Sequence, residues 1–145
     1  MATRWSFSRR LALVALAASP AALTACVTTT TVAYVPEPGA ERLSLVQGQA
    51  LLRQFVGVEC GRLLEAQKAE AVTRVDVDLD TGGDVTEARL QRTVGDERVD
   101  GMIGAVAAQL RLERPADARR APERGELRVG YKCQPQETVV VLQLL

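Results

Sequence analysis

Cysteine is the residue type whose chemistry this sequence constrains most. The 145 residues include Cys26, Cys60 and Cys133 but no histidine. Because histidine is the commonest general base and the commonest neutral metal ligand, a cysteine nucleophile here has no imidazole to activate it. We therefore expect the thiols to serve in covalent attachment or cross-linking, and we predict a protein that is not an enzyme and uses no cofactor.

A second group of chemically competent side chains is acidic and lies between residues 76 and 87. Five carboxylates have the ligand spacing of a calcium-binding EF-hand loop: Asp76, Asp78, Asp80, Asp84 and Glu87. Thr81 stands where that loop needs glycine, and Val77 and Leu79 are apolar where it is polar. The interpretation that we favour is the solvated face of a β-hairpin, with calcium as the lesser hypothesis.

The same acids could also be paired for general acid–base catalysis, as Asp76 with Asp78 or Asp84 with Glu87. Nothing in the sequence marks a pocket around either pair, and paired acids are common on the exposed face of a strand. The pairs therefore do not change the prediction of a non-enzymatic protein.

Basic residues are balanced by acidic ones, with 18 of each. The chain has no charge excess for neutralising phosphates, so we expect no nucleic-acid partner. One basic segment contains Arg114, Arg119, Arg120 and Arg124. It could contact anionic lipid head groups or acids of the cell wall, but solubility is the simpler interpretation.

The N-terminal segment has the layout of a secretory signal. Residues 1–10 are positive, and residues 11–22 form an apolar run that is too short for a membrane-spanning helix, which needs about 20 apolar residues. Leu23-Thr24-Ala25-Cys26 follows and resembles the lipobox of bacterial lipoproteins. The resemblance implies cleavage before Cys26, a diacylglycerol on its sulfur and acylation of the new amine. The alternative is a plain secretory signal with a chance cysteine.

Lipid on Cys26 would anchor the chain in the bacterial cell envelope through more than one acyl chain. By resemblance to lipoprotein sorting, Val27 favours the outer membrane, facing the periplasm. Arg9 and Arg10 give a partial match to a twin-arginine signal, so both export routes stay open. The predicted organisation is a signal peptide over 1–25, a lipidated tether over 26–43 and a folded domain over 44–145.

With Cys26 assigned to lipid, Cys60 and Cys133 are left as an even pair in an oxidising compartment, which predicts one disulfide. The alternative is two buried free thiols. A bridge that closes a loop of about seventy residues would stabilise the fold by roughly 4 kcal/mol in the chain-entropy model.

Hydrophobic periodicity predicts a helix over residues 45–68, with Ser44 and Gln47 as a capping box. Its apolar face comprises Leu52, Phe55, Val56, Cys60 and Leu63. Alternation then predicts strands over 74–80 and 86–91, joined by a glycine turn at 81–84.

A second helix of about 12 residues follows an N-cap at Asp96. After a loop over 115–125, strands are predicted over 127–133 and 139–145. The last strand is apolar on both faces, so we expect it to be central or covered. The periodicity turns Cys60 and Cys133 toward one shared layer, and the fold predicted is α+β: a small, largely antiparallel sheet of three to four strands packed against two helices.

Residues 74–133 resemble the C-terminal domain of the TonB family. The shared pattern is a strand, a glycine turn ending at Val85, a strand, a helix start at Gly95 to Asp100, Arg114-Pro115-Ala116, Gly125 and a closing strand. The resemblance implies a module that pairs strands with partner segments in the periplasm. Because this chain lacks the long proline-rich span of TonB transducers, we do not expect an energy-transducing role.

We therefore predict a lipid-anchored periplasmic protein-interaction module, with a periplasmic or outer-membrane protein as partner. One alternative is a structural lipoprotein of outer-membrane or envelope assembly. Another is a calcium-binding surface lipoprotein that uses the carboxylates from Asp76 to Glu87.

Overall fold

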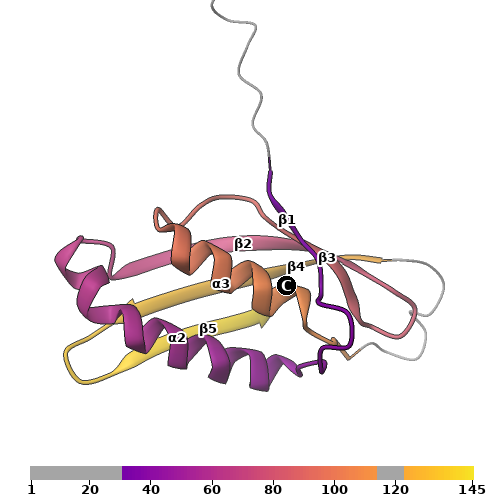
Figure 1. Cartoon of the computed structure of the whole chain (residues 1–145), viewed down its shortest axis with the longest axis horizontal. Helices are drawn as coiled ribbons and strands as arrows, with labels where there is room; N and C mark the ends of the chain where they lie inside the picture. The colour runs from indigo at the N-terminus through magenta and orange to yellow at the C-terminus, as the bar shows by residue number, and fades with distance from the viewer. Residues whose placement is uncertain (1–30, 114–122) are drawn as a thin grey trace, which may run out of the picture. The chain divides into compact units, whose positions relative to one another are not determined.

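The structure, a computed structural model, describes residues 31–113 and 123–145. These residues form one antiparallel sheet and two helices, which confirms the predicted α+β class (Figure 1). The sheet has five strands in the order β1-β3-β2-β4-β5, where three to four were expected. The strands are β1 (Ala33–Tyr34), β2 (Glu70–Leu79), β3 (Val85–Leu90), β4 (Glu123–Cys133) and β5 (Thr138–Leu144).

Helices α2 (Leu45–Glu65) and α3 (Glu97–Ala108) cover the same face of the sheet (Figure 1). Helix α2 lies against β5 and β4, and α3 lies against β3 and β1. The hydrophobic core fills the layer between them, and its largest fully buried side chains include Leu52, Leu63, Ile103, Leu110 and Leu127. The opposite face of the sheet carries no helix from the described residues.

Helix α2 begins where the sequence predicts. The Ser44 hydroxyl accepts a hydrogen bond from the Gln47 amide, and the Gln47 side chain accepts one from the Ser44 amide. The helix ends at Glu65, three residues before the predicted end. Phe55 was expected on its buried face but is 37% exposed, because that face follows Leu52, Val56 and Cys60.

Helix α3 has the predicted length of 12 residues and the predicted N-cap, since Asp96 accepts a hydrogen bond from the Val99 amide. Gly104 lies under the ring of Tyr34, so close that a Cβ there would overlap the ring. This close approach seats strand β1 on the sheet edge, paired with β3.

The structure corrects the predicted start of the folded domain. Residues 33–34 belong to the sheet although they lie in the predicted tether of 26–43, and the compact unit begins at Thr31. A two-residue strand has too little alternation for periodicity to predict.

Strands β2 and β4 are longer than predicted. The loop predicted up to residue 125 ends by Glu123, where β4 begins, because Glu123–Leu127 pairs with Val75–Leu79 of β2. In the hairpin turn between β2 and β3, Gly83 has a φ of 89°, and Asp80 accepts hydrogen bonds from the amides of Gly82 and Asp84.

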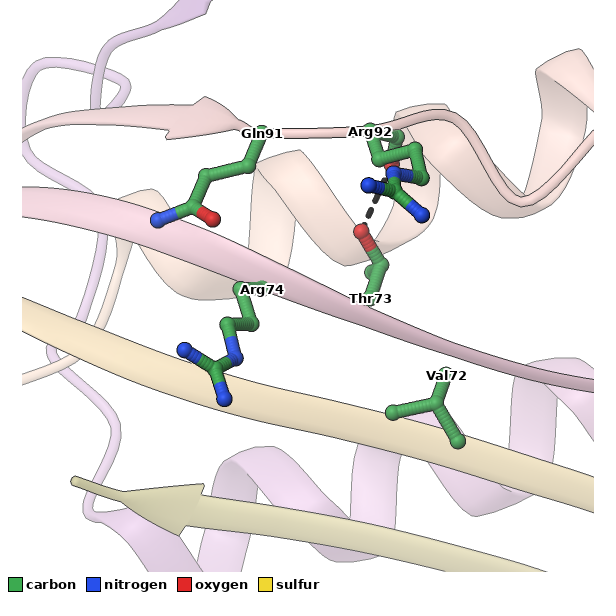
Figure 2. Close-up of a pocket in the computed structure, with 5 residues that line it drawn as sticks. All are labelled: Val72, Thr73, Arg74, Gln91 and Arg92. Carbon is green, nitrogen blue, oxygen red and sulfur yellow. Dashed lines mark hydrogen bonds between the residues drawn. The ribbon is translucent and has the colours of Figure 1, made fainter.

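Strand β2 extends past β3. The residues Glu70–Arg74 have β4 on one side, but β3 pairs with β2 only from Val75 onward. The Thr73 hydroxyl donates to the Arg92 carbonyl oxygen at 2.6 Å and holds the departing chain beside β2 (Figure 2). A polar notch of about 360 Å³ results, lined in part by Arg74, Gln91 and Arg92.

Several sequence predictions lie outside the described residues: the signal segment, the lipid site at Cys26, the paired Arg9 and Arg10, and the basic residues from Arg114 to Arg120. Within the described residues, neither helix has the length and apolar character needed to cross a membrane.

Candidate protein-interaction site

Strand β5 is the long free edge of the sheet. Its residues Thr138–Leu144 pair with Leu127–Cys133 of β4, and no described strand pairs with its other side. The prediction that this strand is central or covered is therefore wrong. On the face of the sheet opposite the helices, the side chains of Val139 and Val141 are 37% and 46% exposed.

Alternate residues of an antiparallel edge strand turn their backbone groups outward. The Leu145 amide donates to the Glu126 carbonyl of β4, whereas the Leu142 amide donates to a side chain of α2. The alternation therefore directs the backbone groups of Val140, Leu142 and Leu144 away from β4, toward an incoming strand.

Gln49 of α2 occupies one of these outward groups, because its Oε1 accepts a hydrogen bond of 3.0 Å from the Leu142 amide. Gln49, Arg53 and Gly57 are spaced four residues apart and share one face of α2. A Cβ on Gly57 would lie 3.6 Å from the Thr138 hydroxyl. This helix face therefore runs along the β5 edge, with the exposed Arg53 between the two contacts.

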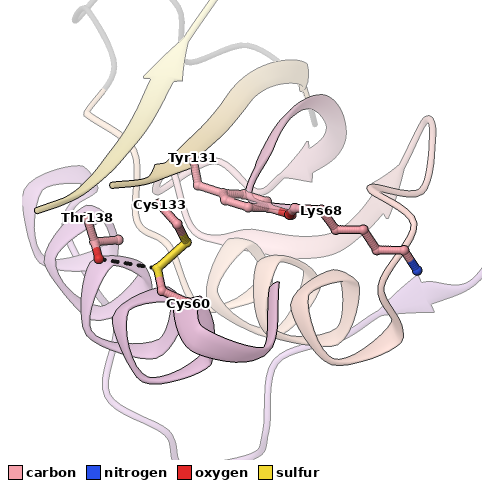
Figure 3. Close-up of a disulfide and its surroundings, with 5 residues drawn as sticks. All are labelled: Cys60, Lys68, Tyr131, Cys133 and Thr138. Atoms are coloured by element: carbon pink, nitrogen blue, oxygen red, sulfur yellow. Dashed lines mark hydrogen bonds between the residues drawn. A yellow bond between two sulfur atoms is a disulfide. The ribbon is translucent and has the colours of Figure 1, made fainter. Parts of the chain in front are cut away.

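The face of α2 that runs along the β5 edge, which we call the rim, has the disulfide at one end, beside the start of β5 (Figure 3). The sulfurs of Cys60 and Cys133 lie 2.11 Å apart and both residues are buried, so the structure has the predicted cysteine pair at bonding distance. The Thr138 hydroxyl lies 3.4 Å from the Cys60 sulfur, to which it donates because a bridged sulfur has no hydrogen. Helix α2 is thereby joined to the end of β4 and the start of β5.

A hollow of about 280 Å³ lies where the β5 edge ends. It opens between the start of α2 and the chain after Leu110, and much of its lining is apolar. The lining residues are Ser44, Leu45, Val46, Arg111, Leu112, Glu113 and Leu144. Because Leu144 belongs both to the edge and to the hollow, a strand added to β5 would bring a side chain to its mouth.

The opposite edge of the sheet is more closed. There β1 covers part of β3 through pairs at Arg89 and Ala88, and Tyr34 of β1 packs on α3. Short edge strands of this kind are one way in which proteins limit strand addition. Strand β5 is thus the better candidate of the two edges.

The carboxylates predicted as lesser calcium ligands are not gathered into one site. Asp78 binds Arg89, Asp84 binds Arg111, and Asp76 accepts a hydrogen bond from Gln91. In the part of the chain that the structure describes, no group of three or more acidic, cysteine or histidine side chains could hold a metal ion. The EF-hand spacing falls instead on a strand and a tight turn, as the hairpin interpretation requires.

Arginine partners lower the pKa of several carboxyl groups in the sheet and at the start of α3. The hydrogen bonds from Arg89 lower the pKa of Asp78, and those from Arg111 lower the pKa of Asp84. The hydrogen bonds from Arg62 lower the pKa of Asp96 to about 2. Because these groups stay ionised and paired with arginines, they support the fold.

The sequence did not reveal Gln49, Arg53 or the exposed valines as features of a site. A glutamine in a helix gives no signal of binding a strand 93 residues away. The β5 segment is apolar on both faces, a pattern that favours burial, yet β5 lies at the edge of the sheet.

Comparison with protein-family models, with curated proteins and with solved structures finds no match for this chain.

Proposed function

We propose that this chain is a lipid-anchored, non-enzymatic module of the bacterial envelope that binds an extended segment of a partner protein by adding it to β5. The observation that carries the proposal is the free edge of β5, whose outward backbone groups lie beside a rim fixed by the disulfide. In such strand addition, backbone hydrogen bonds give affinity and neighbouring pockets give specificity.

The rim indicates the chemistry of the partner segment. Arg53 stands over the edge and favours an acidic side chain on the added strand. The hollow at Leu144 favours an apolar side chain at one end of that strand. The Gln49 side chain must leave the Leu142 amide as the strand binds, since both use the same donor.

The resemblance to the TonB C-terminal domain also supports this proposal. The order strand, turn, strand, helix, strand over Glu70–Cys133 is the order that the resemblance implies. The lipid on Cys26 is part of the same proposal and rests on the lipobox-like residues before it.

Photo-cross-linking tests the edge. A photoreactive residue replaces Arg53 in the lipidated protein, and the control replaces Arg98 on α3, away from β5. We expect a cross-linked envelope protein from position 53 alone. A Leu144→Pro variant should remove that adduct, because proline lacks the outward amide and leaves the β4 ladder intact.

An adduct from both positions, or one that persists in Leu144→Pro, contradicts edge binding. The identity of the captured protein then separates the roles: a transport receptor fits the interaction module, whereas barrel-assembly or cell-wall proteins indicate a structural lipoprotein.

The anchor is tested separately by Cys26→Ser. We expect the natural protein to need detergent for extraction from membranes, because two or more acyl chains hold it. The serine variant should come off in high salt. A variant that still needs detergent contradicts lipidation at Cys26.

A further inference from the structure

The face of the sheet opposite the helices carries a second surface with a different composition. At one end of this face lie Val72 and Arg74 of β2, Arg128 and Lys132 of β4, and Val139 and Val141 of β5, which we call the basic–apolar patch. Figure 2 shows Val72 and Arg74 projecting to the same side of β2, away from Thr73.

Strand register makes the patch continuous. Val72 pairs with Gly130, which pairs with Val141, so two valines flank a glycine in one row across three strands. Val72 is 57% and Val141 46% exposed. The rows on either side bring Arg74 beside Arg128 and Lys132 beside Val139. Valines and cations are therefore interleaved on one surface.

Two of the three cations of the patch are not ion-paired within the described residues. In the described part of the chain, Arg128 and Lys132 form no ion pair, and Arg74 pairs only with Glu126, at 3.0 Å. Glu70 stands opposite Lys132 at the margin of the patch. Farther along the same face, Asp78 and Arg89 form an ion pair.

The chain enters the sheet from the side of this end. Ala33 pairs with Arg89 and Tyr34 with Ala88, so the N-terminal end of β1 points toward Gln91, whose backbone amide donates to the Arg74 carbonyl oxygen. Six residues separate Ala33 from Cys26, a reach of about 25 Å at most. This step rests on the proposed function: a lipid anchor on Cys26 would hold this end of the sheet near the bilayer.

We propose that the basic–apolar patch docks on the surface of an anionic phospholipid bilayer. The guanidinium and ammonium groups bind lipid phosphates, and the valines enter the boundary between head groups and acyl chains. This orientation leaves the outward backbone groups of β5 open along the membrane plane. It also uses residues distinct from the basic segment of Arg114 to Arg124, since Arg124 lies at the far end of β4.

Vesicle sedimentation tests the patch without the lipid anchor. The chain from residue 26 onward with Cys26→Ser contains every residue of the core and is mixed with two kinds of vesicle. One is phosphatidylcholine, and the other contains about one third phosphatidylglycerol. We expect at least ten-fold stronger partition onto the anionic vesicles, lost in high salt.

The charge-reversed variant Arg128→Glu/Lys132→Glu should lose that preference. Its control, Gln54→Glu/Arg98→Glu, adds negative charge on the exposed faces of the helices and should keep it. The Val141→Asp variant, which replaces an apolar side chain of the patch, should bind the anionic vesicles several-fold more weakly. Equal binding to both vesicles, or equal losses in patch and helix variants, would overturn the proposal.

No vesicle binding by the unchanged chain would also overturn the proposal. That outcome would favour an acidic protein as the occupant of the patch. Because the experiment contains neither lipid anchor nor partner, its failure leaves the β5 edge and Cys26 to their own tests.

Discussion

The guanidinium of Arg62 binds both carboxylate oxygens of Asp96, at 2.5 and 3.0 Å, and so joins α2 to the N-terminus of α3. Asp96 also caps α3 through the Val99 amide, and only 7% of its side chain is exposed. One carboxylate therefore serves both the helix cap and the contact between the helices that cover the sheet.

Replacement of Asp96 by alanine should be the most damaging single polar substitution in this layer. It removes a helix cap and leaves Arg62 without its carboxylate partner, so we expect a loss of about 2–3 kcal/mol in the free energy of unfolding. Urea denaturation measures it. Asp76→Asn on the exposed face is the matched control, with an expected change within about 0.5 kcal/mol. Equal effects of the two substitutions would contradict the role given to Asp96.

Stability should fall in acid through the same residue. Arg62 lowers the pKa of Asp96 to about 2 from an ordinary value of 3.8. The folded state therefore binds a proton less readily than the unfolded state, so this contribution is full above about pH 4 and is lost as pH falls toward 2. Asp78 and Asp84 act in the same direction.

The check is the urea midpoint between pH 6 and pH 2.5, with Asp96→Asn as comparison. The variant should show a shallower decline than the natural chain. A parallel decline in both proteins would mean that Asp96 does not control the acid response.

Loss of the disulfide should lower stability without changing the fold. Cys60 and Cys133 are separated by 73 residues, and opening that loop should cost roughly 3–4 kcal/mol in the chain-entropy model. Urea melts of the Cys60→Ser/Cys133→Ser variant, with and without reductant, measure this. Reductant should destabilise the natural chain but not the variant. An unchanged stability of the natural chain in reductant would contradict the disulfide.

Removal of the Gln49 side chain should open the β5 edge. In Gln49→Ala the Leu142 amide loses its acceptor and faces water, so its hydrogen exchange should quicken about ten-fold, with roughly 1 kcal/mol of stability lost. Gln54→Ala, on the outer face of α2, is the control. Unchanged exchange at Leu142 would show that Gln49 does not protect the edge.

Sequence periodicity predicted the helices and strands in which apolar and polar residues alternate over several turns or several residues. Helix α2, the β2–β3 hairpin and the inward placement of Cys60 and Cys133 follow from local patterns, and so does the α+β class. Element ends and β1 were missed because partners distant in sequence decide them: Tyr34 is placed by Gly104, and Glu123 by Leu79.

The candidate site was the least predictable part. A strand that is apolar on both faces favours burial on average, yet in this sheet no strand lies beyond β5 among the described residues. Whether such a strand is covered depends on strand order, which local sequence does not encode. The Gln49–Leu142 contact depends on the same order.

The central claim is that β5 accepts a partner strand, and amide hydrogen exchange of β5 with the cross-linked partner added tests it most directly. The account predicts at least ten-fold slower exchange at the amides of Val140 and Leu144, which face outward, with the Val141 amide in the β4 ladder unchanged. Protection that appears elsewhere on the domain while Val140 and Leu144 keep their exchange rates would contradict it.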